Sequence, residues 1–391
     1  MEFSLGTWAI EPWDTLTTKL MKIPVLSFFT GGGFLDLGFE EAGFEINWSN
    51  EVNPVFADLY EFGMTTWRHA QGKPPVKISD RRTITGITCK EILATAFPAG
   101  TPKLFGVIGG PPCPDFSSAG KNRGSTGRHG RLTSAFVRKI CQLHPGFFVF
   151  ENVTGLFKTK PHRRYLDRLV NRLERNGYRV DMRILNALEL GVPQDRERLI
   201  VIGITKELIS HIVGREFERG IRDWFPWPEN PDYKGAKTRY SWPGKVPAGG
   251  RAVRPKDIPI ELTVASVLGT NRAMSKLPNG DEHFKPYSKR FKSVLEGDTK
   301  RKSFKRLHRY RFSPTACYGH NEVHLHPWKD RRLAVREAMR IQGIPDNYAL
   351  PTTASLGPKF KLVSNGVPVP MAREVARSLR QFLTKSNGHL G

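Results

Sequence analysis

The order of apolar and polar positions along the chain predicts an α/β fold. Between Pro24 and Gly203, short apolar runs typical of buried strands alternate with longer stretches of helical periodicity. The predicted strands read PVLSFF, INWSNE, LFGVIGG, FFVFENV and LIVIGI, and helices are predicted over 35–43 and 161–176. Buried strands that alternate with helices are characteristic of a mostly parallel sheet covered on both faces, so we expect a doubly wound fold.

The pattern changes after Ile204. The segment 224–259 contains too much proline and glycine for long regular elements. Lysine and arginine crowd together within 284–311, and helical periodicity returns over 333–342 and 368–383. We therefore predict an N-terminal extension (1–23), an α/β domain built from 24–204 and 328–391, and an irregular basic region (205–327) inserted between its two parts.

Charge indicates the kind of partner. The formal net charge is +24 and the sequence pI is about 10.1. A polyanion, usually a nucleic acid, explains this excess better than solubility does, because a balanced surface would serve solubility equally well. Composition alone leaves DNA and RNA both open.

The cysteines and the apolar runs exclude several classes of protein. Four widely spaced cysteines contain no C-x-x-C pair, which argues against a disulfide framework and fits a reducing cytoplasm. No signal peptide and no membrane-spanning run is recognisable. His324 and His326 have no third ligand nearby in the sequence, and we predict no metal site.

A glycine-rich loop predicts a cofactor site. In SFFTGGGFLDLGF, three glycines follow a predicted strand and precede a helix, where backbone can approach a ligand closely. Glu51 ends the next strand, where a carboxylate can accept hydrogen bonds from ribose hydroxyls. Phe34 and Asp36 break the strict G-x-G-x-x-G pattern, which favours a nucleoside-type cofactor over a dinucleotide. Many tight strand-to-helix turns bind no ligand, so the glycine loop alone does not establish a cofactor site.

Cys113 is the candidate nucleophile. In GGPPCPDFSSAGKNRG it comes just after a strand, at the edge where open α/β sheets bind ligands. Two prolines precede it, and Lys121, Arg123, Arg128 and Arg131 follow, which suits a phosphate backbone and would lower the pKa of a thiol. A buried packing cysteine would need neither the prolines nor the basic loop.

A carboxylate and two arginines complete the candidate site. Glu151 ends the strand FFVFEN, and a carboxyl beside apolar residues tends to keep the proton that a general acid needs. Arg196 and Arg198 stand two apart at the start of a strand, so both are expected on one face, where they could orient Glu151 or hold a carbonyl oxygen. Glu151 could instead cap a helix or form an ion pair, and an R-x-R pair is often only an exposed face.

With these residues in place, the chain resembles the DNA (cytosine-5)-methyltransferases of the restriction–modification type. The glycine loop with Glu51 resembles the family's S-adenosylmethionine motifs, and GGPPCPDFSSAGKNRG resembles its nucleophile loop. ENV resembles the acid motif and QDRER the arginine motif. RRLAVREAMRIQGIPDNY resembles the segment that braces the recognition domain, and SNGVPVPMAREVARSL resembles the last motif, which returns to the cofactor pocket. The motifs follow the family's order from Pro24 to Leu379.

The resemblance implies a fold, a cofactor and a role for each residue. It implies a Rossmann-like, S-adenosylmethionine-dependent catalytic domain, with 205–327 as a smaller target-recognition region. Cys113 would attack C6 of a cytosine flipped out of the duplex, Glu151 would donate a proton toward N3, Arg198 would contact the cytosine and Glu151, and Arg196 would support the site. The cofactor residues implied are Phe29, Thr30, Gly31, Gly33, Glu51, Val52, Pro111 and Asn365. The nucleic-acid contacts implied are Ser117, Lys121, Arg123, Arg128 and Arg131.

Four positions depart from the family pattern. Pro114 replaces a glutamine after the nucleophile, and Phe34 replaces a glycine of the cofactor loop. Val52 replaces an aromatic residue, which predicts weaker stacking on adenine. No acidic residue stands near Gly86, where one that contacts the adenine amino group is expected, and Asp80 is a poor substitute. Cofactor affinity is therefore left open.

The resemblance also implies partners. We expect methylation of a specific sequence in duplex DNA by a monomer in the cytoplasm, associated with the nucleoid, together with a restriction endonuclease that acts on the same site. Two alternatives stay open: a tRNA cytosine-5 methyltransferase, and a DNA-binding relative without catalysis.

Overall fold

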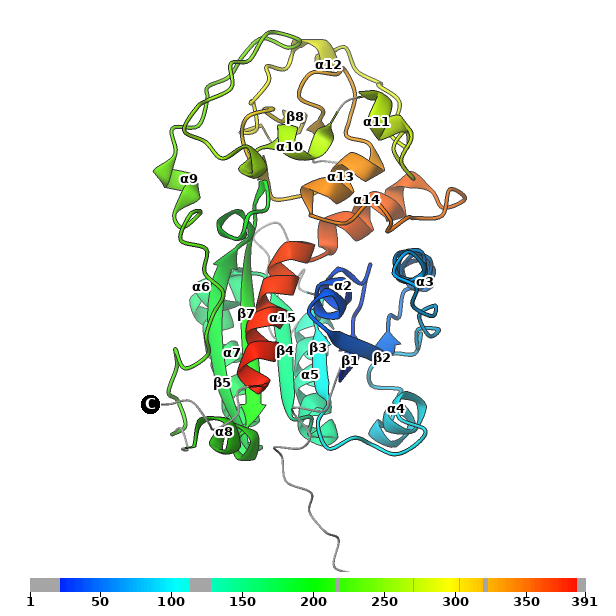
Figure 1. Cartoon of the computed structure of the whole chain (residues 1–391), viewed down its shortest axis with the longest axis vertical. Helices are drawn as coiled ribbons and strands as arrows, with labels where there is room; N and C mark the ends of the chain where they lie inside the picture. The colour runs from blue at the N-terminus through cyan, green and yellow to red at the C-terminus, as the bar shows by residue number, and fades with distance from the viewer. Residues whose placement is uncertain are drawn as a thin grey trace, which may run out of the picture.

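The computed structural model describes residues 22–112, 128–214, 218–269, 271–301, 303–318 and 323–384, with side chains omitted at 128, 129, 271 and 272. Its centre is a six-stranded sheet in the order β2-β1-β3-β4-β7-β5 (Figure 1). The strands are β1 (Ile23–Phe28), β2 (Phe44–Asn50), β3 (Gly106–Gly109), β4 (Phe147–Asn152), β5 (Tyr178–Asn186) and β7 (Glu197–Thr205). The first four run parallel, and β7 is antiparallel to both β4 and β5. The predicted α/β fold with a mostly parallel sheet is confirmed.

Helices cover both faces of the sheet. α2 (Phe34–Glu41), α8 (Lys206–Val213) and α15 (Val369–Leu383) pack on one face, and α4 (Cys89–Ala96), α5 (Arg128–Leu143) and α7 (Lys160–Arg175) pack on the other. Strand β4 shows how alternation divides its side chains: Phe147 and Val149 join the first layer, Phe148 and Phe150 the second. All four are at most 1% exposed, because the sheet is buried on both faces.

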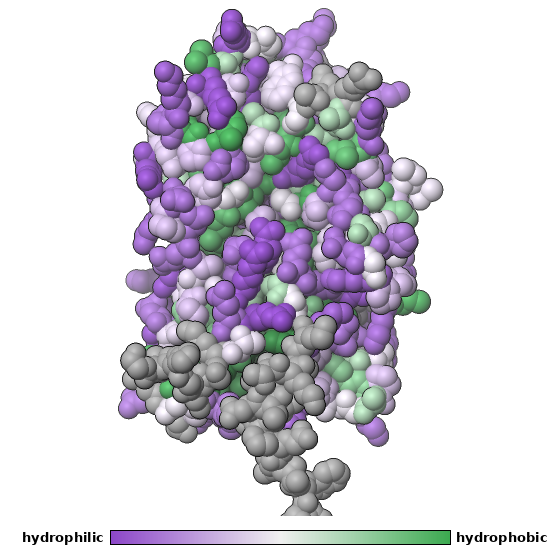
Figure 2. Space-filling model, viewed as in Figure 1, coloured by the Kyte–Doolittle hydropathy of each residue, from purple (hydrophilic) through white to green (hydrophobic). Residues whose placement is uncertain are grey.

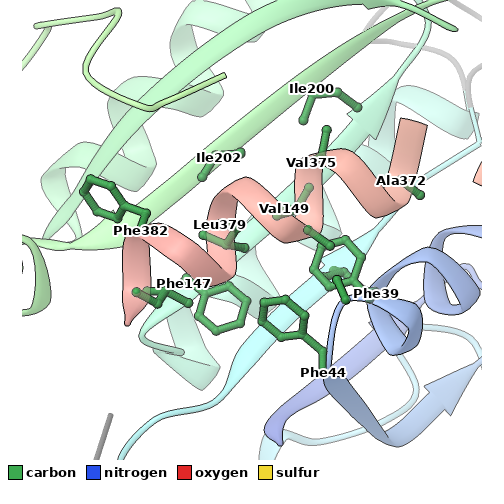
Figure 3. Close-up of a cluster of buried hydrophobic side chains, with 14 of the residues drawn as sticks. Phe39, Phe44, Phe147, Val149, Ile200, Ile202, Ala372, Val375, Leu379 and Phe382 are labelled. Atoms are coloured by element: carbon green, nitrogen blue, oxygen red, sulfur yellow. The ribbon is translucent and has the colours of Figure 1, made fainter. Parts of the chain in front are cut away.

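The C-terminal helix α15 returns to the sheet. Its residues Ala372, Val375, Leu379 and Phe382 recur at helical spacing and face Val149, Ile200 and Ile202 of the sheet (Figure 3). α15 also crosses α2 closely at Gly38, where a Cβ would lie 2.5 Å from that of Ala372. This sheet lobe is therefore assembled from both ends of the described chain.

One strand of the six-stranded sheet was absent from the prediction. β5 alternates apolar and polar residues and lies at the sheet edge, beside the antiparallel β7. The continuous apolar runs that predicted the other strands are a property of strands buried on both faces, so an edge strand escapes that criterion.

The remaining helices connect this lobe to the other. α3 (Pro54–His69) begins with Pro54 at its first position, and the side chain of its cap Asn53 accepts from the amides of Val55 and Phe56. α6 (Gly155–Lys158) precedes α7, while α13 (Val335–Ile341) and α14 (Leu356–Asn365) lie between the two lobes (Figure 1).

Among its described residues, the second lobe contains only short elements. They are α9 (Ala236–Arg239), α10 (Val264–Leu268), α11 (Asn271–Ser275), α12 (Arg290–Ser293), a 3-10 turn (Ile260–Leu262), and the pair β8 (Lys305–Arg306) with β10 (His324–Leu325). A further short pair, β6 (Gln194–Asp195) with β9 (Ser313–Pro314), joins the second lobe to the sheet lobe. A 3-10 turn (Ala187–Leu190) lies next to this pair. This matches the expectation of few long elements in a segment rich in proline and glycine.

Part of the region 205–327, predicted to recognise the target, packs with the sheet lobe. Leu208 and Ile209 of α8, together with Phe225 and Trp227, are buried in the same core as the sheet. Helix α8 and the segment 224–227, both within the region 205–327, thus cover the sheet instead of forming the second lobe.

Buried arginines hold the second lobe together. Arg306 is fully buried and donates to the carbonyls of Val294, His326 and Lys329. Arg336 of α13 is also fully buried and donates to the carbonyls of Pro278, Pro345 and Tyr348. Because irregular backbone leaves carbonyls without secondary-structure partners, guanidinium groups satisfy them here.

Candidate active site at the carboxyl edge of the sheet

The glycine loop turns tightly at the end of β1. Phe29, Gly31 and Gly33 all have positive φ (56°, 53° and 71°), and the Gly33 amide donates to the Thr30 carbonyl at 2.7 Å. A Cβ at Gly33 would lie 2.6 Å from the Tyr60 ring, so only glycine fits there. At Gly31 no atom lies within 4 Å of a Cβ position, so the space beside this residue is open.

Glu51 connects the next strand to this loop. Its carboxylate is 9% exposed and accepts from the Gly31 amide at 3.0 Å and from the Asn53 amide at 2.9 Å. Burial raises the pKa of Glu51, against the lowering effect of these two amides. The Thr30 hydroxyl, also buried, has no hydrogen-bond partner within the described residues. An open turn with a carboxylate and an unpaired hydroxyl fits a cofactor that carries a ribose and further polar groups.

Val52, one of the departures from the family pattern, and Asp80 both lie next to the end of β2. Val52 is 51% exposed beside Glu51. Asp80 lies next to the end of β2, where its carbonyl accepts from the Glu51 amide at 3.1 Å. Its carboxylate accepts from Nη2 of Arg82 at 2.8 Å, and the hydrogen bonds from Arg82 hold its pKa below the ordinary value. The acidic side chain at this edge is therefore paired with a cation.

Phe34 fills the space that the family glycine would leave. Its ring is 1% exposed and packs edge-on against Tyr348. A Cβ on Gly366 would lie 2.0 Å from the Phe34 ring, so the residue after Asn365 packs directly against the end of the glycine loop. Asn365 itself is exposed at the end of α14.

Tyr348 is a residue that sequence reasoning did not identify. Its hydroxyl donates to the Gly32 carbonyl at 2.7 Å from a fully buried position. Tyr348 belongs to IPDNY, a segment interpreted only as a brace for the recognition domain, and nothing in the spacing indicated a contact with the glycine loop. The hydrogen bond ties the segment after α13 to the centre of that loop.

Glu151 and Arg198 form an ion pair at the end of the central strands. Nε of Arg198 lies 2.9 Å from Oε1 of Glu151, and the two side chains are 12% and 11% exposed. Burial raises the pKa of Glu151, although the charges of Arg198 and Arg196 oppose this effect. A Cβ on Gly110 would lie 2.8 Å from Oε2 of Glu151, so the backbone that leads to Pro111 passes directly over the carboxylate.

Arg196 points to a different set of partners. It is fully buried, and Nη2 donates to the carbonyls of Ser364 and Gly366 at 2.8 Å each. Nη1 donates to the Ala316 carbonyl at 3.4 Å. Burial and the charge of Arg198 lower the pKa of Arg196 to about 9, so the side chain stays cationic at neutral pH. Arg196 thus links the edge of β7 to the second lobe and to the end of α14.

Several predicted site residues lie outside the described part of the structure. They are Cys113, Pro114, Ser117, Lys121 and Arg123, and for Arg128 only the backbone is described. Pro111 and Pro112 are described, directly after the Gly110 that contacts Glu151. Arg131 is exposed on α5.

A cavity of about 830 Å³ lies between the start of α3, the segment around Phe284 and Tyr318, and α14. Its walls include the rings of Phe56, Phe284, Tyr287 and Tyr318 and the cations Arg332 and Lys361. The Arg332 guanidinium lies 4.8 Å from the Phe284 ring centre and 5.2 Å from that of Tyr287. The face in Figure 2 carries hydrophilic side chains over both lobes.

Neither a metal cluster nor a membrane-spanning helix is found among the described residues. Within them, no three histidine, cysteine, aspartate or glutamate side chains are grouped so that they could hold a metal ion. No helix in the same part of the chain combines the length and the apolar character needed to cross a membrane.

The fold is shared with known methyltransferases. The chain superposes on the S. pombe Dnmt2 methyltransferase with a TM-score of 0.54 at 14% identity, covering 93% of this chain and 98% of that one. A prophage-encoded E. coli protein gives a TM-score of 0.62 at 22% identity, covering 92% and 99%. These likenesses define the class as a Rossmann-like methyltransferase fold.

Sequence comparison identifies the family. Residues 23–381 match the profile of the C-5 cytosine-specific DNA methylases. The chain is 39% identical to the type II methyltransferase M.NmeDI of Neisseria meningitidis serogroup C, over 94% of this chain and 87% of that protein. It is 31% identical to M.FnuDI of Fusobacterium nucleatum, over 92% and 95%. This chain belongs to the C-5 cytosine-specific DNA methylases, a family of S-adenosylmethionine-dependent enzymes, and is a DNA (cytosine-5)-methyltransferase.

Proposed function

We propose that this chain methylates C5 of a flipped cytosine in a specific duplex sequence, with Cys113 as the nucleophile, and that it is the modification enzyme of a type II restriction–modification system. The observation that carries the proposal is the contact between Gly110 and Glu151. The backbone that leads to Cys113 passes close to Oε2 of the proposed acid, and Arg198 holds its other oxygen, Oε1. Nucleophile and acid would thus approach one pyrimidine ring together.

The proposed residues divide the chemistry between C6 and N3 of the ring. The Cys113 thiolate forms a bond to C6, and the electron pair of the C5–C6 double bond moves into the ring. Glu151 donates its proton toward N3, so that no bare anion forms there. The raised pKa of Glu151 supports this role, since a buried carboxyl keeps its proton more readily. As C5 takes the methyl group the N3 proton returns to Glu151, and loss of the C5 proton then expels the Cys113 thiolate and restores the aromatic ring.

The two arginines would act by positioning. Arg198 fixes the direction of the Glu151 carboxylate through its 2.9 Å contact, and its Nη1 donates to the Glu197 carbonyl at 2.7 Å. Arg196 would hold the second lobe and the segment 364–366 against the sheet edge.

S-adenosylmethionine, when bound, supplies the methyl group. We propose that the turn at Gly31, the Thr30 hydroxyl, Glu51 and the segment after α14 hold it. The open space beside Gly31 and the unpaired buried hydroxyl of Thr30 support this assignment. Phe29, Gly33, Val52 and Pro111 would line the same pocket.

A covalent trap tests the proposal. Duplexes in which 5-fluorocytosine replaces cytosine should form a cross-link that survives denaturing electrophoresis when S-adenosylmethionine is present, because no proton can leave C5. Cys113→Ala should form none, Glu151→Gln should form it much more slowly, and Gly110→Ala should slow it by displacing the carboxylate. Lys90→Gln, on the distant helix α4, serves as the matched control.

Two outcomes would contradict the proposal. One is a stable adduct with Cys113→Ala, which would remove the assigned nucleophile. The other is methylation of tRNA with none on duplex DNA, which would move the substrate to RNA. Sequencing of methylated cytosines in a host that expresses the chain should show a single recognition sequence. The cognate nuclease and the monomeric state stay predictions, tested by cleavage protection and by light scattering.

A further inference from the structure

The second face of the sheet carries a continuous surface of arginines. α5 and α7 pack side by side on that face, opposite α15 (Figure 1). The outward residues of the two helices include Arg131 and Arg138 on α5 and Arg164, Arg168, Arg172 and Arg175 on α7, all of them exposed. We call these six residues the arginine face.

The two helices bring their cations together around Tyr165. This side chain is 8% exposed, and its hydroxyl donates to the Gly130 carbonyl at 2.6 Å, which fixes α7 against the start of α5. The Arg168 guanidinium lies 5.8 Å from the Tyr165 ring centre. Arg138 of α5 and Arg168 of α7 both exert a Coulombic effect on the same phenol, so charges from both helices converge there.

The charge of this surface is not neutralised by any carboxylate of the described residues. Within them, none of the six arginines forms an ion pair, whereas many other arginines of the chain do. The two acidic residues of α7 are already engaged: Asp167 pairs with Arg163, and the buried Glu174 pairs with Arg222. Arg164, Arg168 and Arg172 follow one another at i, i+4 spacing, where like charges repel. Such repulsion is relieved when a polyanion lies across the helix.

We propose that the arginine face binds the phosphate backbone of duplex DNA outside the sequence that is methylated. The stretch from Arg164 to Arg175 covers about 16 Å along the helix axis. A duplex presents one phosphate per strand about every 3.4 Å, so about five phosphates of each strand lie opposite this length. Arginine suits phosphate because its planar group donates two parallel hydrogen bonds.

The chemistry of α7 favours nucleic acid over a membrane. A helix that lies on a lipid surface needs an exposed apolar face. The apolar side chains of α7, among them Leu166, Leu169 and Leu173, are buried in the core of the sheet. Apart from Pro161 in the first turn, the exposed residues of α7 are charged or polar, as for a surface that contacts phosphates.

The experiment compares duplexes of two lengths. Arg164→Gln/Arg168→Gln/Arg172→Gln in the full chain should bind a pool of random duplexes of about six helical turns at least about tenfold more weakly. The slope of log affinity against log salt should fall by about two to three, at roughly 0.9 for each phosphate that the variant no longer neutralises. Duplexes of about two turns should bind as they do to the unmodified chain, because they fill only the catalytic cleft.

A matched variant controls for the loss of charge. Lys77→Gln/Lys90→Gln/Arg219→Gln removes the same number of exposed cations outside the arginine face and should leave both affinities within about twofold. Equal effects of the two variants on the long duplexes would overturn the proposal, because net charge alone would then explain the loss. So would an unchanged salt slope in the arginine variant, or a loss confined to double-stranded RNA.

The inference takes only the identity of the polyanion from the proposed function. Methyl transfer to the short duplexes, measured in the same preparations, keeps the two apart. If the arginine variant methylates short duplexes normally but binds long ones like the unmodified chain, the arginine face fails and the proposed function stands. If the unmodified chain methylates neither length, the proposed function fails, while the length-dependent binding still reports on the arginine face.

Discussion

The guanidinium of Arg198 and the carboxylate of Glu151 meet at 2.9 Å, both almost buried, on neighbouring antiparallel strands. A buried ion pair loses its hydration, and its two members depend on each other. Single and double substitutions of this pair can therefore separate its effect on stability from its effect on catalysis.

Arg198→Ala should lower the free energy of unfolding by about 3 kcal/mol, because it leaves a buried carboxylate without its cation. Urea denaturation measures the loss. The double variant Arg198→Met/Glu151→Gln should regain most of the stability and none of the activity. Arg183→Ala, which breaks exposed ion pairs with Asp223 and Glu229, should cost less than about 1 kcal/mol. A similar cost for Arg183 and Arg198 would contradict the buried pairing.

Tyr348→Phe removes the hydrogen bond to the Gly32 carbonyl and should weaken S-adenosylmethionine binding by about tenfold, the equivalent of about 1.4 kcal/mol. Calorimetric titration of the cofactor measures it. Tyr178→Phe is the control, since that buried hydroxyl donates to the Pro145 carbonyl at 2.9 Å away from the glycine loop. Both variants should lose about 1 kcal/mol of stability, and only the first should lose cofactor affinity.

Phe34 and Gly366 should be energetically coupled. Gly366→Ala is compatible with the backbone, at φ −71° and ψ 158°, yet its Cβ would lie 2.0 Å from the Phe34 ring. We expect a loss of about 1–3 kcal/mol in the native background and almost none once Phe34→Ala has removed the ring. Gly357→Ala, with open space around it, should be nearly neutral. A fixed cost for Gly366→Ala in both backgrounds would exclude the contact.

Asp36 should make stability depend on pH. This buried carboxyl accepts from the Ser27 hydroxyl at 2.6 Å and from the Tyr60 hydroxyl at 2.9 Å. Burial raises its pKa from 3.8 to about 6. Because the folded state holds the proton more tightly, the stabilisation is complete below 3.8 and is lost as the pH rises through about 6.

Asp36→Asn provides the measurement. The stability of the unmodified chain relative to this variant should fall by about 3 kcal/mol between about pH 4 and pH 7, the equivalent of a shift of about two pKa units. Urea denaturation across that range determines the difference. A constant difference would show that Asp36 titrates alike in the folded and unfolded states.

The sequence was sufficient for the class of fold because its strands are buried on both faces. Continuous apolar runs such as those around Phe148 and Ile202 identify such strands without any tertiary information. The edge strand β5 and the reversed direction of β7 were not predictable in this way, since the first alternates like a solvated strand and the second depends on connections across the sheet.

The site was predictable where a residue acts near its own strand end. Glu51 follows β2, Glu151 lies near the end of β4, and Arg198 lies at the start of the antiparallel β7. These strand ends share one edge of the sheet, and the structure brings Glu151 and Arg198 into contact. The contacts of Tyr348 and Arg196 join segments more than a hundred residues apart, so no local pattern indicates them. The net charge predicted the phosphate-binding residues only in part, because the guanidinium groups of Arg306 and Arg336 are buried and donate to backbone carbonyls.

The return of α15 to the sheet has a consequence for biosynthesis. While the ribosome is still translating the second lobe, the sheet face that carries Val149, Ile200 and Ile202 has no C-terminal helix to cover it. A chain whose translation ends before α15 would leave this apolar face exposed, and chaperones or proteases would bind it. Quality control would then clear incomplete copies before any half-made enzyme reached a chromosome.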